Sequence, residues 1–373
     1  LSLHDALPIY LALGSFNFDL APIIIVAFFT VLLVFGTKIG ARVDGAMTVL
    51  KIAIVVFVVI VGFFYVKASN FTPFIPPSQP AAATTGDGAV SAQMAQPLWQ
   101  WATGMTPSIY GVPGILSGAA LVFFAFLGFD VVATASEETK NPHKNVPLGI
   151  GVGMLLIIVM YMLVAIVTTG MVSYKDLAKQ DSPSLATAFE LVGADWAAKI
   201  ISFGIVLGLA TVIMVLLLGL TRIVFAMSRD GLLPRGLSKT GKHGTPAVLQ
   251  IVVGVVVALV AALFDIGVLS DMVNIGTLSA FTLVAISIPI MRKKRPELPR
   301  AFRMPGNPWV PILIALANFW LMLNLSVLTW IRFLVWLVIG FAIYFSYGYW
   351  HARLGKGDLS ETLSDETDRA VNG

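Results

Sequence analysis

The chain has 373 residues, of which 57% are hydrophobic and only 12% are charged, and its mean hydropathy is +0.88. Soluble proteins carry roughly 25% charged residues, so this composition excludes an ordinary soluble domain and indicates an integral membrane protein. Cysteine is absent, which excludes a disulfide framework and a thiolate metal site. The net charge of +4 and the pI of 9.2 would also suit a nucleic-acid-binding protein. The placement of the basic residues has to decide between these two classes.

Nine apolar stretches predict membrane-spanning helices, because a helix needs about 20 apolar residues to cross the hydrocarbon core. The expected fold class is therefore an all-α, polytopic membrane protein. In chain order, the predicted spans are 20–36, 41–66, 114–137, 147–171, 198–227, 246–264, 268–291, 309–328 and 330–350.

The basic residues separate onto the two sides of this predicted topology. Of the 24 Lys and Arg residues, one lies inside a span and most of the others fall in one alternating set of loops. The positive-inside rule places that set in the cytoplasm. The membrane topology thus accounts for the excess of basic over acidic residues, which argues against a nucleic-acid partner. The basic residues of the external loops are Lys67, Lys175, Lys179, Lys199 and Arg332.

The ends of the chain are expected to lie outside the membrane domain. Leu1 to Ile9 has neither a basic segment nor a small-residue cleavage site, so we do not expect it to act as a signal peptide. Residues 1–19 are predicted to be an atypical remnant at the start of a fragment, and residues 20–350 a partial transmembrane domain. Residues 351–373 carry several carboxylates and are predicted to form a disordered cytoplasmic tail.

Two external connections are long enough to hold structure of their own. Residues 68–113 are rich in Pro, Gly, Ala, Thr and Ser, which predicts a surface loop with little fixed structure. Within it, Trp99, Trp101 and Tyr110 are candidates for an interfacial aromatic anchor. In the second connection, a short helix is expected to begin near Ser184.

A glycine and a carboxylate interrupt the third predicted span at its centre. The sequence there reads GILSGAALVFFAFLGFDVVATASEETKNPHKNVP from Gly114 to Pro147, with Gly128-Phe129-Asp130 in the middle. Unpaired backbone at that depth is tolerated only where it faces protein or a water-filled cavity, and intramembrane ionisable groups are functional candidates. We therefore predict a broken helix that forms part of a carrier's substrate site.

Unwinding of residues 124–129 would free backbone carbonyls and amides to bind a zwitterionic solute. The predicted contributors are Phe124, Ala125, Phe126, Gly128 and Phe129. An aromatic run at this spacing more often packs than gates, but beside this break we expect Phe123 and Phe129 to line the site. Asp130 has two interpretations: it caps the second half of the broken helix, or it pairs with a substrate amine or with Lys51.

Lys51 is the other charge predicted to lie at depth. It follows Ala41 by ten residues, or about 15 Å along a helix, which is near the bilayer midplane. A lysine there costs about 2.5–3.5 kcal/mol on insertion scales. Three interpretations remain: a structural pin bonded to carbonyls, an error in the span boundaries, or a titrating amine. Burial favours the neutral amine, so such a group can take up and release a proton.

Other motifs carry no chemistry. The run from Gly236 to His243 nearly matches a phosphate-binding loop, but a histidine replaces the hydroxyl that would reach magnesium and no strand precedes it. The four histidines have no paired spacing, so neither a metal site nor His-based catalysis is expected. The pairs Gly114-xxx-Gly118, Gly149-xxx-Gly153 and Gly204-xxx-Gly208 predict close helix contacts.

Three motifs together resemble the bacterial cationic amino acid transporter family within the amino acid–polyamine–organocation superfamily. They are FFAFLGFDVVATASEETKNP, TRIVFAMSRDGLLP (221–234) and VNIGTLSAFTLVAISIPIMRKKRPELPRAFRMP (273–305), and GARVDGAMTVLKIAIVV (40–56) is similar to the family's fifth helix. The resemblance covers residues 20 to 350. It implies a LeuT-like, five-plus-five inverted repeat in which the nine spans are helices 4–12 and the first three helices are absent.

The resemblance also implies roles for particular residues. Phe124, Ala125, Gly128 and Phe129 fall at substrate-contacting positions of the broken sixth helix. Lys51 matches the lysine whose amine replaces sodium in sodium-coupled relatives. Thr211, as a proton-coupling residue, and Met214, as a substrate contact, are carried over on the eighth helix.

The implied function is secondary transport of amino acids across the bacterial cytoplasmic membrane by alternating access, with the proton as coupling ion. The expected partners are an amino acid, a proton and the lipid bilayer, without metal, cofactor or nucleic acid, and no enzymatic activity is expected. The alternatives are an inactive transporter fragment and a membrane scaffold or sensor without transport activity.

Overall fold

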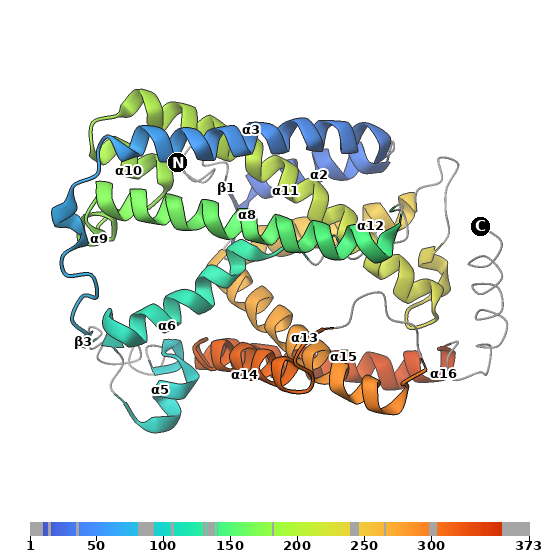
Figure 1. Ribbon diagram of the computed structural model, residues 1–373. Coiled ribbons are helices and arrows are strands. Elements are labelled where there is room, and N and C mark those ends of the chain that lie inside the picture. The colour runs from blue at the N-terminus through green and yellow to red at the C-terminus, as the bar shows by residue number, and fades with distance from the viewer. Residues whose placement is uncertain are drawn as a thin grey trace. The chain divides into compact units, whose positions relative to one another are not determined.

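The structure is a computed structural model built mainly from helices (Figure 1). The predicted N-terminal remnant before Tyr10, Asp130 and the tail after Ala352 lie outside the residues that it describes. The described residues are 10–13, 16–34, 37–80, 93–105, 108–129, 132, 139, 141–180, 183–238, 246–264, 266–297 and 304–352.

All nine predicted spans correspond to apolar helices, but their lengths differ. Five are long enough to cross a membrane: Gly45–Phe63, Lys144–Met171, Asp195–Arg229, Ile266–Lys294 and Val327–His351. Four are shorter than predicted: Pro22–Val34, Gly111–Phe126, Ala247–Leu263 and Trp309–Leu323. Pro246 and Pro308 come directly before the starts of two of these helices, a position that suits proline because its missing N–H would have no helical partner there.

The chain divides into two compact units. The first comprises residues 1–6, 50–205 and 264–334, and the second comprises 7–49, 206–263 and 335–373. Three long helices contribute to both units: α3 (Thr37–Phe63), α11 (Asp195–Arg229) and α15 (Val327–Ile343).

The first unit contains two apolar clusters. One joins Val58 of α3 to the last turns of α8, to α10 and to the first turns of α11, around the fully buried Phe189. The other joins Ala120 of α6 to Ile275 and Leu278 of α13 and to the end of α14. The remaining elements of this unit are η1 (Ala68–Phe71), β3 (Gln79–Pro80), α5 (Leu98–Thr103), β4 (Ser108–Ile109), α6 (Gly111–Val122), η2 (Phe123–Phe126), α8 (Pro142–Met171), α9 (Tyr174–Leu177), α10 (Leu185–Leu191), α13 (Ile266–Lys294) and α14 (Trp309–Leu323).

The second unit is centred on the packing of α2 against α12. Val26 and Leu33 of α2 meet Leu249 and Val253 of α12, together with residues of α11. The remaining elements of this unit are β1 (Tyr10–Leu13), β2 (Phe16–Asp19), α2 (Leu20–Val34), η4 (Arg235–Ser238), α12 (Ala247–Leu263), the π-helix η5 (Tyr344–Gly348) and α16 (Tyr349–His351).

The long external connection has more structure than its composition predicts. The prediction of little fixed structure was wrong for its described parts, which hold η1, the paired strands β3 and β4, and α5. Trp99 is not simply an interfacial anchor: its indole Nε1 donates to Asn324 Oδ1 at 2.9 Å, and its ring stacks on Trp320. Contacts to the α14–α15 turn therefore order this loop, and such long-range contacts leave no trace in local composition.

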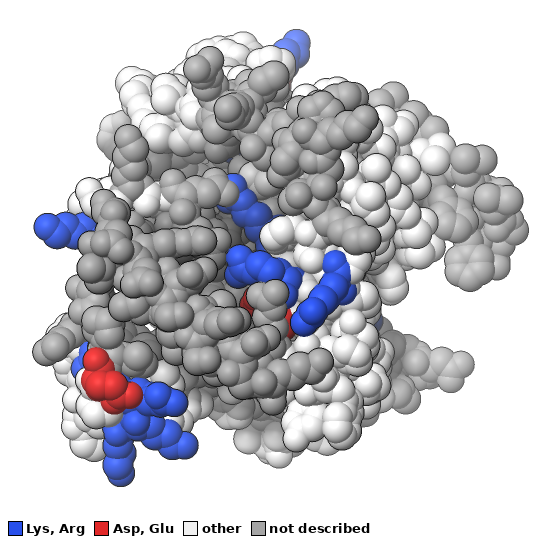
Figure 2. All heavy atoms as spheres, turned by 90° about the vertical axis from the view of Figure 1, so that its right-hand side faces the viewer, with Lys and Arg blue, Asp and Glu red and all other residues white. Residues whose placement is uncertain are grey.

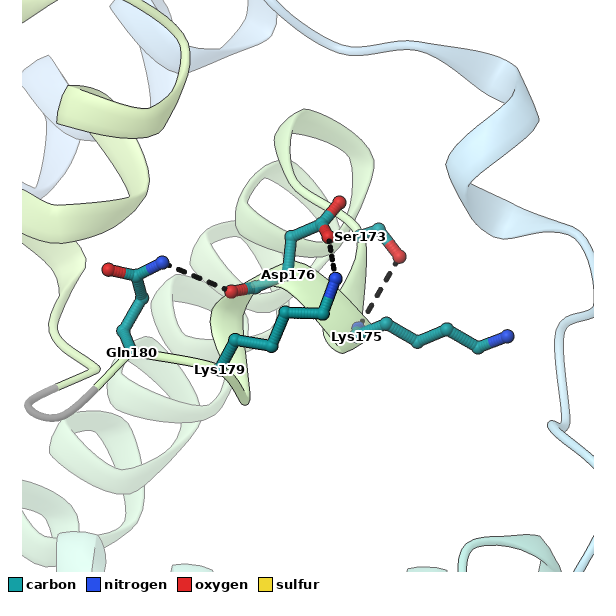
Figure 3. A network of polar contacts seen from close by, with 5 residues as sticks. All are labelled: Ser173, Lys175, Asp176, Lys179 and Gln180. Atoms are coloured by element: carbon teal, nitrogen blue, oxygen red, sulfur yellow. Dashed lines mark hydrogen bonds and ion pairs between the residues drawn. The ribbon is translucent and has the colours of Figure 1, made fainter.

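The short helix predicted near Ser184 is confirmed. Ser184 caps α10 by accepting the backbone N–H of Thr187 at 3.1 Å, the arrangement expected of a serine N-cap. A similar cap orders α9, where the Ser173 hydroxyl accepts from the Lys175 amide (Figure 3). The ion pair between Lys179 and Asp176 in the same network is exposed, so it contributes little to stability.

Only one of the three predicted glycine pairs makes a close contact among its described members. A Cβ added to Gly204 would meet Cγ2 of Ile54 in α3 at 3.0 Å. At Gly118, Gly149 and Gly153 an added Cβ would meet nothing within 4 Å. The prediction of close contact was wrong at these three positions, because spacing alone does not tell which face of a helix meets a neighbour.

A close helix approach in the second unit involves Gly254, which the pattern of paired glycines does not identify. A Cβ there would lie 2.6 Å from Cγ2 and 2.9 Å from Cβ of Thr30 in α2. Thr30 is buried and its hydroxyl donates to the carbonyl of Val26, so its side chain is held in the rotamer that contacts Gly254.

Replacing Gly254 by alanine is therefore expected to destabilise the protein by about 1–3 kcal/mol through overpacking. The measurement is the melting temperature of the purified protein in detergent. Gly276→Ala, where the added methyl group meets nothing within 4 Å, is the matched control. It should melt at or slightly above the temperature of the unmodified protein, because alanine favours a helix over glycine. Equal melting temperatures for the two variants would contradict the close packing of α12 on α2.

Basic residues gather at two helix ends that the sequence predicts to be cytoplasmic. The last turn of α13 carries Arg292, Lys293 and Lys294, and the last turn of α11 carries Arg229. On the face drawn in Figure 2, the described Lys and Arg side chains are more prominent than the described Asp and Glu. The orientation of the chain in the membrane stays a prediction.

Candidate functional site

The helix α6 is interrupted at the position that the sequence predicts. Its regular turns end at Val122 and continue as the 3₁₀ turn η2 to Phe126. Leu127 is then extended, with φ −62° and ψ 142°, and Gly128 has a φ of +115°. Residues with side chains rarely adopt that φ, so glycine permits the chain to leave the helix here. The predicted break is thus confirmed.

The interruption changes the hydrogen bonding of the backbone. In a continuous α-helix the carbonyl of Ala125 would accept the N–H of Phe129, four residues later. The extended Leu127 removes that geometry. The hydroxyl of Tyr161, in α8, donates to the Ala125 carbonyl instead, at 2.8 Å. A side chain from a neighbouring helix therefore satisfies an acceptor that the break has freed.

A second side chain binds α6 just before the break. Asn274 of α13 is fully buried, and its Nδ2 donates to the carbonyl of Ala120 at 3.2 Å. Its Oδ1 has no hydrogen-bond partner among the described residues. The two bonds hold the interrupted segment at two points: Asn274 of α13 binds just before the 3₁₀ turn, and Tyr161 of α8 binds within it.

Aromatic rings surround the segment between these bonds. Phe281 of α13 lies edge-on to Phe123, with ring centroids 6.1 Å apart, and tilted against Phe129 at 5.2 Å. Phe126 meets the ring of Tyr161 at 5.1 Å. Phe123 and Phe129, both expected to line the site, thus share one partner, while Phe124 and Ala125 are exposed.

Lys51 lies near the middle of α3, and its depth in the membrane stays a prediction. It is half-buried, and it makes no hydrogen bond or ion pair with the described residues of the chain. Ile54 and Val58, which follow it at helical spacing, pack against Gly204 and against the buried cluster around Phe189. Lys51 therefore lies on the packed face of its helix, and the structure gives it no pinning partner among the described residues.

Thr211 and Met214 belong to the second unit, so their proximity to Lys51 or to the break stays a prediction. Thr211 is buried, and its hydroxyl donates to the carbonyl of Gly208 at 2.9 Å. Met214 is buried in the cluster of α2, α11 and α12. Its contacts in that unit are packing contacts.

Three residues at the break were not predicted: Tyr161, Asn274 and Phe281. Asn274 had a detectable signal, because an amide in an apolar span usually bonds to a neighbouring helix. Tyr161 and Phe281 had none, since aromatic residues in an apolar helix are most often packing residues.

Two surface hollows near Asn70, of about 400 and 550 Å³, contain none of the predicted site residues.

The fold and the site define a class: a polytopic, all-α membrane protein with an interrupted helix held between two neighbours. The family model described as amino acid permease matches residues 16–349. The chain belongs to this amino acid permease family, whose members are permeases and transporters rather than enzymes.

Three relatives show the range of the family. The branched-chain amino acid permease BcaP of Bacillus subtilis is 41% identical over 345 residues, which cover 92% of this chain and 67% of the relative. The methylthioribose transporter of the same organism is 38% identical over 340 residues, 91% of this chain and 66% of the relative. The vacuolar cationic amino acid transporter 4 of Arabidopsis thaliana is 33% identical over 299 residues, 79% of this chain and 45% of the relative. The chain thus spans about two thirds of the length of the two bacterial relatives.

Proposed function

We propose that this protein is a secondary carrier for amino acids in the bacterial cytoplasmic membrane, with its substrate bound at the interruption of α6. The observation that carries the proposal is the carbonyl of Ala125, which has lost its helical N–H partner and accepts from Tyr161 instead. Three residues later Gly128 has a φ of +115°, and aromatic rings contact the segment between them. An unwound segment at membrane depth offers the dipoles that a zwitterion needs. Phe123, Phe124, Ala125, Gly128 and Phe129 are the proposed contacts.

We propose that the substrate is an amino acid with an apolar side chain. Among the described residues, the three side chains from neighbouring helices for which a contact to the broken segment is given are neutral: Tyr161, Asn274 and Phe281. Aromatic walls with few polar groups suit a branched or aromatic side chain, and two relatives are named branched-chain amino acid permeases. A cationic substrate would instead need Asp130 as its counter-ion.

Proton coupling is proposed to run through Lys51. Lys51 is half-buried and has no hydrogen-bond or ion-pair partner among the described residues. A proton that binds there in one state of the carrier and leaves in the other would couple its movement to that of the substrate. Thr211 would supply a hydroxyl beside Lys51, and Met214 a contact to the substrate. The nine helices would be helices 4–12 of a LeuT-like inverted repeat that works by alternating access.

The test is uptake of radiolabelled leucine by the intact protein in proteoliposomes, with an inward proton gradient. We expect leucine to accumulate, and unlabelled isoleucine and valine to compete more strongly than arginine or methylthioribose. Uptake of arginine in preference to leucine would overturn the apolar substrate and favour pairing with Asp130. Uptake of none of these solutes would overturn the carrier function.

A further inference from the structure

The broken segment of α6 has two polar attachments, and they come from different helices. Tyr161 of α8 donates to Ala125, whose carbonyl has lost its helical partner, and Asn274 of α13 donates to Ala120, one turn before the 3₁₀ segment. Between the two attached carbonyls lie Leu121 to Phe124, where α-helical turns change to 3₁₀ turns. These attachments therefore bracket the change in backbone geometry.

The two attachments differ in their surroundings. Asn274 is fully buried among apolar residues of α6, α13 and α14, and its Oδ1 lacks a partner among the described residues. A buried unpaired acceptor costs stability, so this position is not optimised for stability alone. Tyr161 is half-exposed on α8, and its ring meets only Phe126 among the ring contacts of the segment.

We propose that Tyr161 and Asn274 are positioning residues that hold the interrupted segment in the geometry that binds substrate. The inference rests on the proposed function, because it concerns the same site. The Tyr161 hydroxyl orients the Ala125 carbonyl, which retains a second lone pair for a substrate ammonium group. Asn274 fixes the helical end of the segment against α13, whose Phe281 holds Phe123 and Phe129 from the same side.

A positioning role and a merely structural role predict different kinetics. Tyr161→Phe removes one oxygen and leaves the ring on Phe126. If the hydroxyl orients a substrate-binding carbonyl, its loss weakens binding, and the KM for leucine should rise about five- to tenfold. Vmax per folded transporter should remain within about twofold. If the hydroxyl only stabilises the fold, the amount of active protein falls and KM stays the same.

The experiment measures leucine uptake and melting temperature for the intact protein, Tyr161→Phe, Asn274→Ala and a matched control. The control is Tyr349→Phe, because the Tyr349 hydroxyl has no hydrogen-bond partner among the described residues and its ring is exposed. We expect a raised KM for Tyr161→Phe and Asn274→Ala, and an unchanged KM for Tyr349→Phe. Asn274→Ala should also melt earlier because the residue is buried. An unchanged KM for Tyr161→Phe would overturn the proposal.

A second readout does not depend on transport. The chain contains no cysteine, so Phe124→Cys introduces a thiol on an exposed position of the segment that can be labelled with a water-soluble maleimide. We expect Tyr161→Phe to change the labelling rate at this position by more than threefold, and Tyr349→Phe to leave it unchanged. If the unmodified protein moves none of the solutes, the proposed function fails, and labelling alone decides: a changed rate supports the positioning role and an unchanged rate overturns it.

Discussion

Replacing Lys51 by methionine is expected to abolish proton-driven accumulation of leucine, with a loss of at least tenfold. Methionine keeps the length and the apolar stem of lysine but cannot bind a proton. Lys51 lies mid-helix in α3, on the packed face, half-buried and without a partner among the described residues. At its predicted depth, a lysine cation costs several kcal/mol to place in the membrane, and intramembrane charges of this kind are functional candidates.

The measurement compares uptake by proteoliposomes with and without an inward proton gradient, across external pH 5 to 8. Lys67→Met is the matched control, because Lys67 is exposed just beyond the end of α3. The control should accumulate leucine as the unmodified protein does. Leucine–leucine exchange, which needs no net proton movement, should survive in Lys51→Met. Full accumulation with its normal pH dependence in Lys51→Met would exclude this amine as the coupling group.

The helices of this protein are predictable because membrane insertion is a local property of the chain. A stretch such as 147–171 is apolar around its whole circumference, so its length and composition alone identify a helix. The short helix α10 was predictable for another local reason, the cap that Ser184 provides. The bounds of α12 were predicted to within one residue, whereas α14 ends at Leu323, five residues before the predicted end of its span.

The break in α6 was predictable for a similar reason, since Gly128 in an apolar run is a local signal. The partners of the break were not, because they depend on which helices meet. Phe281 is 152 residues from Phe129 in sequence, and nothing in its own neighbourhood distinguishes it from other aromatic residues of apolar helices. The partners of Gly204 and Gly254 were unpredictable for the same reason, because their close contacts are made with Ile54 and Thr30 on helices distant in the sequence.

The second large effect is expected from replacing Gly128 by alanine. The added methyl group would meet nothing within 4 Å, so the change is not a steric clash with neighbours. The strain is in the backbone, because a φ of +115° is unfavourable for any residue with a side chain, at about 1–3 kcal/mol. Alanine also favours a continuous helix by about 1 kcal/mol relative to glycine. Both the backbone strain and the helix propensity of alanine therefore favour a continuous helix over the interrupted one.

Gly128→Ala should therefore reduce leucine uptake at least tenfold while the melting temperature stays the same or rises. A loss of activity without a loss of stability is the result that separates a functional interruption from a packing defect. Gly118→Ala in the same helix is the matched control: it also adds a methyl group in open space, but in regular helical backbone, and it should transport normally. If Gly128→Ala transports leucine as well as Gly118→Ala does, the unwound backbone is not where the substrate binds.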